Sequence, residues 1–173
     1  AHFTWIFRKY PVDVSEYPAD LADDQLILWQ HRFYLPIAFL VGFVIPTCFG
    51  WALGSWFGGF VWAALFRIVF LHHCSFLVNS YLHSFGRQPY CRSTSARDST
   101  LVALLSYGEG FHNFHHRFQY DYRNGVRWYH WDPTKWLIRI LSPLGITANL
   151  RRAPERSIQE ARRRFSRDEA YSL

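Results

Sequence analysis

The stretch FYLPIAFLVGFVIPTCFGWALGSWFGGFVWAALF, residues 33–66, decides the fold, because it contains no formally charged side chain. The low charge continues beyond it: Arg67 is the only Lys, Arg, Asp or Glu before Gly86. A helix that crosses a bilayer needs about 20 predominantly apolar residues. The segment is long enough for two such helices.

A break in the middle of this run separates the two helices. Gly and Ser recur in GWALGSWFGG, residues 50–59, and its Trp51 and Trp56 suit a membrane–water interface. We therefore predict an all-α integral membrane protein with a transmembrane hairpin, its helices at about 33–50 and 58–83. The alternative is a buried hairpin in a soluble protein, and the length and aromatic content of the run argue against it.

Composition fits one domain that lies in a membrane. Of the 173 residues, 50% are hydrophobic and 20% aromatic, and none is Met. Since a complete gene product begins with Met and this chain opens at Ala1, we expect a fragment or a processed chain. The three cysteines form no CxxC pair, so we expect small apolar fillers and no disulfide. They are Cys48, Cys74 and Cys91.

Charge indicates the orientation of the hairpin. Cationic residues flank it on both sides, whereas the short connecting turn carries none, so the positive-inside rule places both chain ends in the cytoplasm. The flanking cations are Arg8, Lys9, Arg32, Arg87, Arg92 and Arg97. No phosphate loop or nucleic-acid signature accompanies the net charge of +6, which favours an anionic membrane surface or substrate as its partner.

The remaining segments complete a single domain over residues 1–173. We expect a cytoplasmic linker (1–32) with a short helix starting near Asp23, then the hairpin (33–83), a helical cytoplasmic cap (84–152) and a charged tail (153–173) that forms a solvated or frayed helix. Within the cap, we predict a helix over 98–118 and another that begins at Asp132 and Pro133. The apolar stripe of the latter predicts a helix lying flat on the membrane. The stripe is Trp136, Leu137, Ile140 and Leu141.

Three histidines stand close together in GEGFHNFHH, residues 108–116. On a helix that turns about 100° per residue, His112, His115 and His116 fall within an arc of about 100°, so their imidazoles point to one side. Asn113 and Phe114 face elsewhere. The cluster is therefore directed, although a solvated His-rich turn remains an alternative.

A fourth histidine lies at the cytoplasmic end of the second predicted spanning helix. Asn79 and His83 are four residues apart and share a face with His72 and Phe76. His72 lies about 16 Å from His83 along the helix axis, so both cannot bind one metal. We expect His72 and His73 to be core or tunnel-wall histidines and Arg67 to be a paired structural charge.

Four histidines and an asparagine predict a transition-metal site. Zinc is satisfied by three or four such ligands, whereas iron in oxygen chemistry usually needs more. Glu109 and Asp121 would be poor substitutes for missing ligands. Either the site is a small mononuclear one, or further ligands lie upstream of Ala1.

The segments LVNSYLH (77–83) and GEGFHNFHHRFQYDYR (108–123), together with RQPYCRS (87–93), resemble the membrane acyl-CoA (Δ9-type, stearoyl-CoA) fatty acid desaturases over about Ala1 to Arg152. The resemblance implies the C-terminal half of a domain with four transmembrane helices and a cytoplasmic cap. It implies two iron ions bound by nine histidines and one asparagine-held water. It assigns His83, His112, His115 and His116 as ligands and Asn79 as the water-mediated one.

The same resemblance suggests roles for other residues. Arg8 and Lys9 match residues that contact the phosphates of the CoA headgroup, although ordinary cytoplasmic charge would explain them equally. Ser75 and Phe76 match a position that lines the bend of the acyl tunnel. Glu109 and Asp121 are candidates for orienting the ligand rings, with a helix-start or loop-stapling role equally open. His2 follows the expected end of an earlier histidine box and is not implied as a ligand.

The implied reaction is the O₂-dependent removal of two hydrogens from a fatty acyl-CoA to give a cis double bond, with electrons from a cytochrome b5-like or ferredoxin-like donor. Two alternatives stay open: a related membrane lipid hydroxylase or desaturase, and a non-catalytic membrane module with a zinc-binding His cluster. The two earlier boxes, H-x-x-x-x-H and H-x-x-H-H, are expected upstream, and the isolated chain is expected to be inactive. For its location we favour a bacterial inner membrane, with the endoplasmic reticulum as the alternative.

Overall fold

The structure, a computed structural model, describes residues 2, 7 and 23–170, with side chains described as far as Arg164. It divides into two compact units: Ala1–His2 with Cys74–Leu173, and Phe3–His73. Within the described residues all regular elements are helical, and the only β-pairing consists of isolated bridges of Asp98 with Arg87 and Phe111. The all-α prediction is therefore confirmed for this part of the chain.

Helix α2 (Gln25–Arg32) precedes the hairpin. The carboxylate of Asp24 accepts hydrogen bonds from the backbone N–H groups of Leu26 and Ile27, at 2.8 and 3.2 Å. Such caps satisfy N–H groups that have no partner within the helix. The predicted short helix near Asp23 is thus confirmed, with its cap one residue later.

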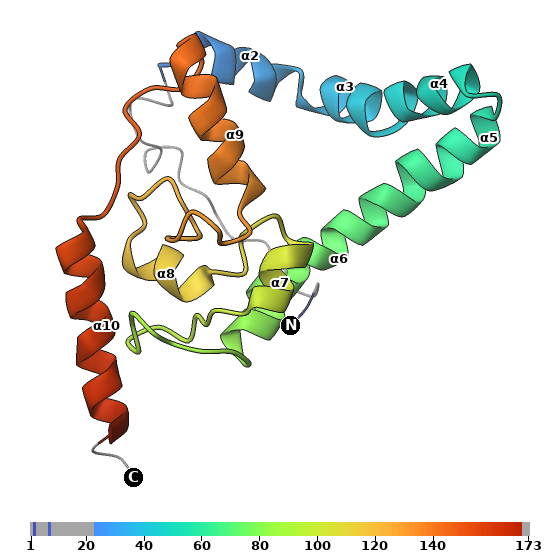
Figure 1. Ribbon diagram of the computed structural model, residues 1–173. Helices are drawn as coiled ribbons and strands as arrows, with labels where there is room; N and C mark the ends of the chain where they lie inside the picture. Colours follow the sequence, from blue (N-terminus) through green and yellow to red (C-terminus); the bar gives the residue numbers. More distant parts are fainter. Residues whose placement is uncertain (1, 3–6, 8–22, 171–173) are drawn as a thin grey trace. The chain divides into compact units, whose positions relative to one another are not determined.

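Two long apolar helices follow, Tyr34–Ala52 and Trp56–His83, of 19 and 28 residues. Both are long and apolar enough to cross a membrane, which confirms the two predicted apolar helices. The break between them is only Leu53 to Ser55, shorter than the predicted interruption. Figure 1 shows them joined at this turn. The first consists of α3 (Tyr34–Phe39), a π-helical segment (Leu40–Val44) and α4 (Ile45–Ala52); the second consists of α5 (Trp56–Gly58), a π-helical segment (Gly59–Phe66), α6 (Arg67–Ser80) and a 3₁₀ turn (Tyr81–His83).

Glycines permit the two helices to touch beside the turn. A Cβ added to Gly50 would lie 2.3 Å from the Cα of Gly59, which is too close for any other residue. The hydroxyl of Ser55 caps the returning helix by accepting from the N–H of Gly58 at 3.0 Å. The Gly and Ser residues that predicted the break therefore have two functions: they end one helix and seat the next against it.

Arg67 links the two helices of the hairpin through backbone carbonyls. Its Nη2 donates to the carbonyl of Gly42 at 3.0 Å, and its Nε to that of Ala63 at 2.8 Å. The predicted structural role is confirmed, with backbone carbonyls as the partners of the charge. His72 is hydrogen-bonded to the carbonyl of Ile68 at 2.7 Å, but it and His73 are exposed, so the core position expected for them is wrong and the tunnel-wall alternative stays a prediction.

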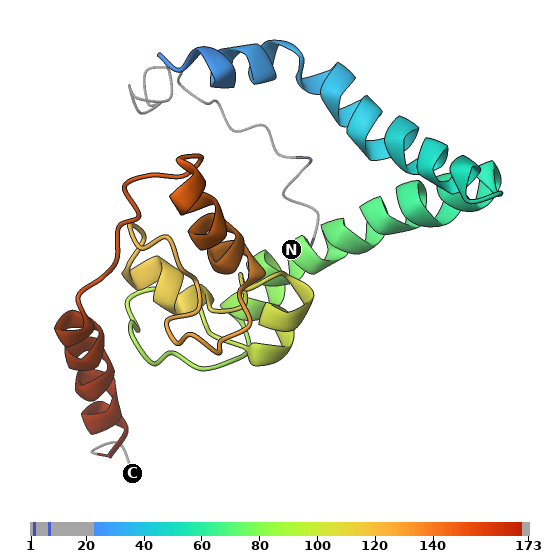
Figure 2. The same ribbon diagram turned by 45° about the horizontal axis from the view of Figure 1, so that its top comes forward.

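The unit that contains Cys74–Leu173 carries the four histidines predicted as metal ligands. Its helices beyond α6 are α7 (Thr100–Leu105), α8 (His112–Arg117), α9 (Pro133–Leu141) with a 3₁₀ turn (Ser142–Leu144), and α10 (Glu155–Ala170). In both views α8 lies between the green segment that follows α6 and the orange α9 (Figures 1 and 2). Asp132 caps α9 by accepting from the N–H of Lys135 at 3.0 Å, which confirms the predicted start at Asp132 and Pro133.

The prediction of one helix over 98–118 is wrong. The chain leaves the helical conformation after Leu105, where Tyr107 and Gly108 have positive φ angles of 54° and 106°, and it becomes helical again only at His112. Gly110 explains why the chain can turn so tightly. A Cβ at this position would lie 1.9 Å from the backbone nitrogen of Ala103, so only glycine fits. The Gly-Glu-Gly segment packs its second glycine against the backbone of α7 before α8 begins.

The predicted solvated tail is partly buried. Ala153, Ile158 and Ala161 pack in one hydrophobic cluster with Tyr90, Phe114 and Phe118. The interpretation of the tail as solvated is therefore wrong for the first turns of α10. Among the charged residues of α10, Ile158 and Ala161 form a short apolar stripe on one face of the helix.

The three cysteines are free. Cys74 and Cys91 are buried, as expected of small apolar fillers, whereas Cys48 is exposed on the first spanning helix. The filler interpretation is therefore wrong for Cys48.

Candidate metal site

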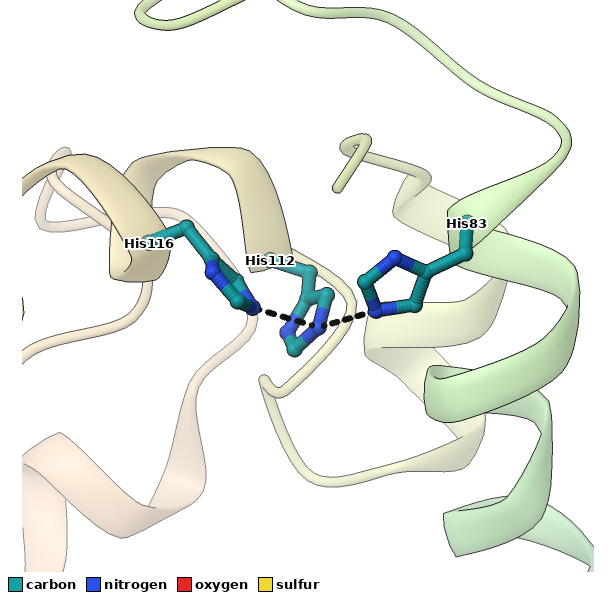
Figure 3. A group of neighbouring side chains, drawn as sticks. All are labelled: His83, His112 and His116. Atoms are coloured by element: carbon teal, nitrogen blue, oxygen red, sulfur yellow. Dashed lines mark hydrogen bonds between the residues drawn. The ribbon is translucent and has the colours of Figure 1, made fainter. Parts of the chain in front are cut away.

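Three imidazoles converge where the second spanning helix ends and α8 begins (Figure 3). The Nε2 atom of His112 lies 3.2 Å from Nε2 of His83 and 3.1 Å from Nε2 of His116. The candidate ligand atoms of all three residues lie within 4.8 Å of one another. These distances are short enough for one metal ion to bind all three nitrogens.

His115 lies apart from this cluster. Its ring centroid is 6.1 Å from that of His112 and 5.9 Å from that of His116. It lines a cavity of about 420 Å³ together with Asn79 and His112, so His112 borders both places. The other residues that line this cavity are Ser75, Val78, Glu109 and Asn124. The structure thus brings His83, His112 and His116 together and leaves Asn79 and His115 at a neighbouring cavity.

The protonation of the cluster suits a cation. Burial, together with the neighbouring imidazoles, lowers the pKa of His112 to about 4. Burial, with the charge of His115, also lowers the pKa of His116. His112 is therefore neutral at pH 7, and a neutral imidazole offers a lone pair to a metal. The donor set fits a divalent transition metal.

Ser95 orients the first of these rings. Its hydroxyl lies 2.8 Å from Nδ1 of His83, and the opposite nitrogen, Nε2, points to His112. If Nε2 held a metal, Nδ1 would carry the ring proton and its N–H would donate a hydrogen bond to the hydroxyl of Ser95. The sequence analysis missed this residue, because nothing in RQPYCRSTS (87–95) marks one hydroxyl among several.

Asn113 fixes α8 to the segment that carries Ser95. The side chain is fully buried, and its amide makes four hydrogen bonds to backbone groups. Oδ1 accepts from the N–H groups of Tyr90 and Cys91, at 2.8 and 3.1 Å, and Nδ2 donates to the carbonyls of Cys91 and Ala96, at 2.6 and 2.8 Å. The prediction that Asn113 and Phe114 face away from the histidines is confirmed, since both lie in the interior.

Asp98 holds the beginning of α8. Its Oδ1 accepts from the N–H groups of Asn113 and Phe114, at 2.7 and 3.3 Å. Burial nevertheless raises the pKa of Asp98 to about 7, because desolvation outweighs these two donors. The sequence analysis did not identify Asp98 as a cap, because a capping residue 14 positions before its helix leaves no recognisable local sequence pattern.

The two acidic residues proposed to orient the ligand rings have different surroundings. Glu109 lines the cavity with His112 and His115, and partial burial raises its pKa. Asp121 instead pairs with Arg123 at 2.8 Å and accepts from the N–H of Ala153 at 2.8 Å. These contacts lower the pKa of Asp121 and match its alternative role as a loop staple.

The substrate residues implied by the resemblance are placed in part. Ser75 lines the cavity with Asn79 and His115. Phe76 meets the ring of His2 edge-on at 5.4 Å, and His2 also lies 2.9 Å from the hydroxyl of Ser80. Arg8 and Lys9 lie outside the described residues.

Comparison with known proteins decides the family. The fatty acid desaturase family model matches residues 3–147. The chain belongs to the fatty acid desaturase family. This confirms the resemblance seen in the sequence and places the histidine cluster in a family that is named for its reaction.

Three relatives illustrate the similarity. The chain is 45% identical over 163 residues to a probable acyl-CoA desaturase of Schizosaccharomyces pombe, with 92% of this chain and 34% of that protein aligned. The chain is 38% identical to acyl-CoA desaturase 1 of Saccharomyces cerevisiae, with 82% of this chain and 28% of that protein aligned. It is 32% identical to the sn-1 stearoyl-lipid 9-desaturase of Anabaena variabilis, with 90% of this chain and 56% of that protein aligned. The chain thus spans about a third of the length of the fungal relatives.

Proposed function

We propose that this chain is the C-terminal part of an O₂-dependent di-iron acyl-CoA desaturase. The observation that carries the proposal is the cluster of His83, His112 and His116, whose candidate ligand atoms lie within 4.8 Å of one another in a member of the desaturase family. The relatives named as acyl-CoA desaturases support an acyl-CoA substrate. The related lipid desaturase keeps a lipid-bound acyl chain as the second candidate.

Two neighbouring places could hold the two irons. One is the three-histidine cluster, and the other is the cavity bordered by Asn79, His112 and His115. We propose His83, His112, His115 and His116 as direct ligands, with Asn79 acting through a water. The remaining ligands would come from the part of the parent protein that this chain does not cover, in the expected H-x-x-x-x-H and H-x-x-H-H boxes.

When bound, the irons would supply the O₂ activation that removal of hydrogen from an unactivated methylene pair requires. The chain's own residues would hold the irons and orient the ligand rings. Lowered pKa values favour the neutral form of His83, His112 and His116, whose nitrogens point to one place, Ser95 fixes the ring of His83, and Asn113 with Asp98 fixes α8. Ser75, at the cavity wall, lies where an acyl chain could be guided, and Arg8 and Lys9 would contact the phosphates of CoA.

The proposal includes a membrane topology and partners. We propose a four-span protein with both chain ends in the cytoplasm, because cationic residues flank the hairpin and its turn has none. O₂ and a cytochrome b5-like or ferredoxin-like donor would complete the reaction. The higher identity to the fungal relatives supports the endoplasmic reticulum, whereas the cyanobacterial relative supports a bacterial membrane.

Metal and product analysis of the full-length parent protein tests the proposal. We expect about two irons per chain and a product lighter than the substrate by two hydrogens. His112→Ala, which removes the residue bordering both places, should lose both irons, whereas His115→Ala should keep metal at the three-histidine cluster. Exposed Gln119→Ala is the control and should keep both irons. A product that gains oxygen would indicate a hydroxylase, and zinc without iron would indicate a non-catalytic module.

A further inference from the structure

A second cavity lies in the unit that contains Cys74–Leu173, and it is larger than the one that His112 and His115 line. Its volume is about 570 Å³, and we call it the outer cavity; the cavity of about 420 Å³ is the inner cavity. Arg87, Thr100 and Arg162 line the outer cavity and are exposed, so it is reached from solvent. None of the four proposed metal ligands lines it.

Asn124 lines both cavities, and no other described residue does so. Its backbone is fixed, because its N–H donates to Oδ2 of Asp132 at 2.9 Å. Its side-chain amide has no hydrogen-bond partner among the described residues. Since an amide donates and accepts at once, this side chain can bind water on the side of either cavity.

Asp98 brings a proton-binding group to the outer cavity. Its Oδ1 accepts from the N–H groups of Asn113 and Phe114, whereas Oδ2 has no hydrogen-bond partner in the described part of the chain. Burial raises the pKa of Asp98 to about 7, so near neutral pH this carboxyl both takes up and releases a proton. A group whose pKa lies near the working pH is suited to pass protons on. The other titratable or charged side chains of the outer cavity are Arg87, Tyr90, His130 and Arg162.

The proposed reaction consumes protons at the inner cavity and releases water there. Two hydrogens leave the substrate with their electrons, two further electrons come from the donor and two protons come from solvent, and together they reduce one O₂ to two waters. Glu109 and His115 line the inner cavity and are exposed in this chain. The part of the parent protein that supplies the remaining ligands would cover this side. Protons then need another way in, and water another way out.

We propose that the outer cavity is the route by which protons enter the inner cavity and product water leaves it, with Asp98 as the proton relay and Asn124 as the water-binding link. The inference rests on the proposed function, because it requires the reaction to take place at the inner cavity. Both cavities are large enough for several waters, each of which needs roughly two to four polar partners. A proton taken up by Asp98 from solvent passes to the waters beside Asn124, and Asp98 is then ready for the next proton.

Water-proton relaxation tests the route without turnover. The full-length parent protein is loaded with Mn²⁺ instead of iron, and a long-chain acyl-CoA is bound so that its acyl chain fills the substrate tunnel. The relaxation of bulk water then reports how fast water exchanges between the bound metal and solvent. Asn124→Leu replaces the amide by an apolar group of similar size and should slow this exchange about threefold or more, because it removes both hydrogen-bonding groups.

Matched variants make the result specific to Asn124. Gln119→Leu makes the same amide-to-leucine change at an exposed residue that lines neither cavity, and it should leave the exchange unchanged. Asn124→Gln keeps an amide and should retain most of the exchange. Equal exchange in Asn124→Leu and Gln119→Leu overturns the route, even if the protein desaturates its substrate. A parent protein that binds no metal overturns the proposed function and the route together.

Asp98→Asn tests the relay, because it keeps an oxygen for the N–H groups of Asn113 and Phe114 and removes the titrating proton. A positioned acid or base typically contributes about 100-fold or more to a rate; since water alone replaces part of a relay, we expect kcat of the iron-loaded parent protein to fall roughly tenfold with KM unchanged. Added imidazole, a diffusible proton carrier, should restore much of the rate, and the solvent isotope effect should rise. An unchanged kcat, or a loss that imidazole leaves in place, means that Asp98 only supports α8 and overturns its part in the route.

Discussion

The hydroxyl of Ser95 lies 2.8 Å from Nδ1 of His83, on the side of the ring opposite the nitrogen that meets His112. Ser95→Ala removes the partner that fixes this ring. Outer contacts of this kind typically change metal affinity about 10- to 100-fold, so we expect a loss in that range. Competition with a chelator measures it on the full-length protein.

Ser93→Ala is the control, because Ser93 lies on the same segment but its hydroxyl contacts the sulfur of Cys91 at 3.0 Å. Its metal affinity should stay within about twofold of the unaltered protein, and Ser95→Thr should restore most of the affinity. Equal affinities for Ser95→Ala and Ser93→Ala would show that Ser95 does not orient the ring.

Asn113→Ala should destabilise the unit that carries the histidines. The substitution leaves the N–H groups of Tyr90 and Cys91 and the carbonyl of Cys91 without their partner, whereas the carbonyl of Ala96 keeps the side chain of Gln88 as a donor. Each buried group left unpaired costs about 1–3 kcal/mol, so we expect a total of at least about 3 kcal/mol. The melting temperature in detergent should fall by several degrees, and a drop no larger than that of exposed Gln119→Ala would contradict this account.

Gly110→Ala and Gly145→Ala form a matched pair of glycine substitutions. A Cβ at Gly110 would collide with the backbone of Ala103, whereas a Cβ at Gly145 meets nothing within 4 Å although its φ is 70°. We expect Gly145→Ala to cost about 1 kcal/mol. Gly110→Ala should prevent the loop before α8 from packing against the backbone of α7. Limited proteolysis compares the two, and similar resistance to cleavage would refute the tight turn.

Asp98 makes stability depend on pH. Because burial raises its pKa to about 7 from an ordinary value of 3.8, the folded chain holds a proton that the unfolded chain releases. Its contribution is fully present below about pH 4 and is lost as the pH rises through 7. Asp98→Asn keeps an oxygen that can accept from the same N–H groups and removes the titration.

The melting temperature at pH 5.5 and 7.5 measures this effect. The difference between the two values should be smaller in Asp98→Asn than in the unaltered protein. Asp121 opposes the trend only at lower pH, since its lowered pKa makes its contribution vanish as pH falls below its ordinary range. An unchanged difference in Asp98→Asn would show that Asp98 is already ionised at both pH values.

The sequence predicted the elements that depend on local pattern. A long run without charge and a cluster of Gly and Ser are enough to give two long apolar helices and a turn, and Asp132 with Pro133 is enough to start α9. The directed face of the histidines also followed from helical spacing, although His115 lies apart, because α8 has only six residues and two different neighbours.

The contacts that could not be predicted from the sequence join segments that are distant along the chain. Asp98 caps a helix from a separate segment, Ser95 reaches back 12 positions to His83, and Ile158 enters a core among charged residues. None of these has a periodic signal. The break at Tyr107 was hidden because a non-glycine residue with positive φ is rare, and it depends on Gly110 packing against Ala103.

The burial of Ile158 and Ala161 against Phe114 has a consequence for the order of events during synthesis. Helix α8 carries three of the four histidines proposed as ligands, yet part of the core beneath it comes from α10, which the ribosome makes about 40 residues later. Helix α8 therefore lacks part of its hydrophobic core until the chain has been synthesised beyond residue 161. A chain that stops at residue 152 would lack this part of the core and leave α8 incompletely supported.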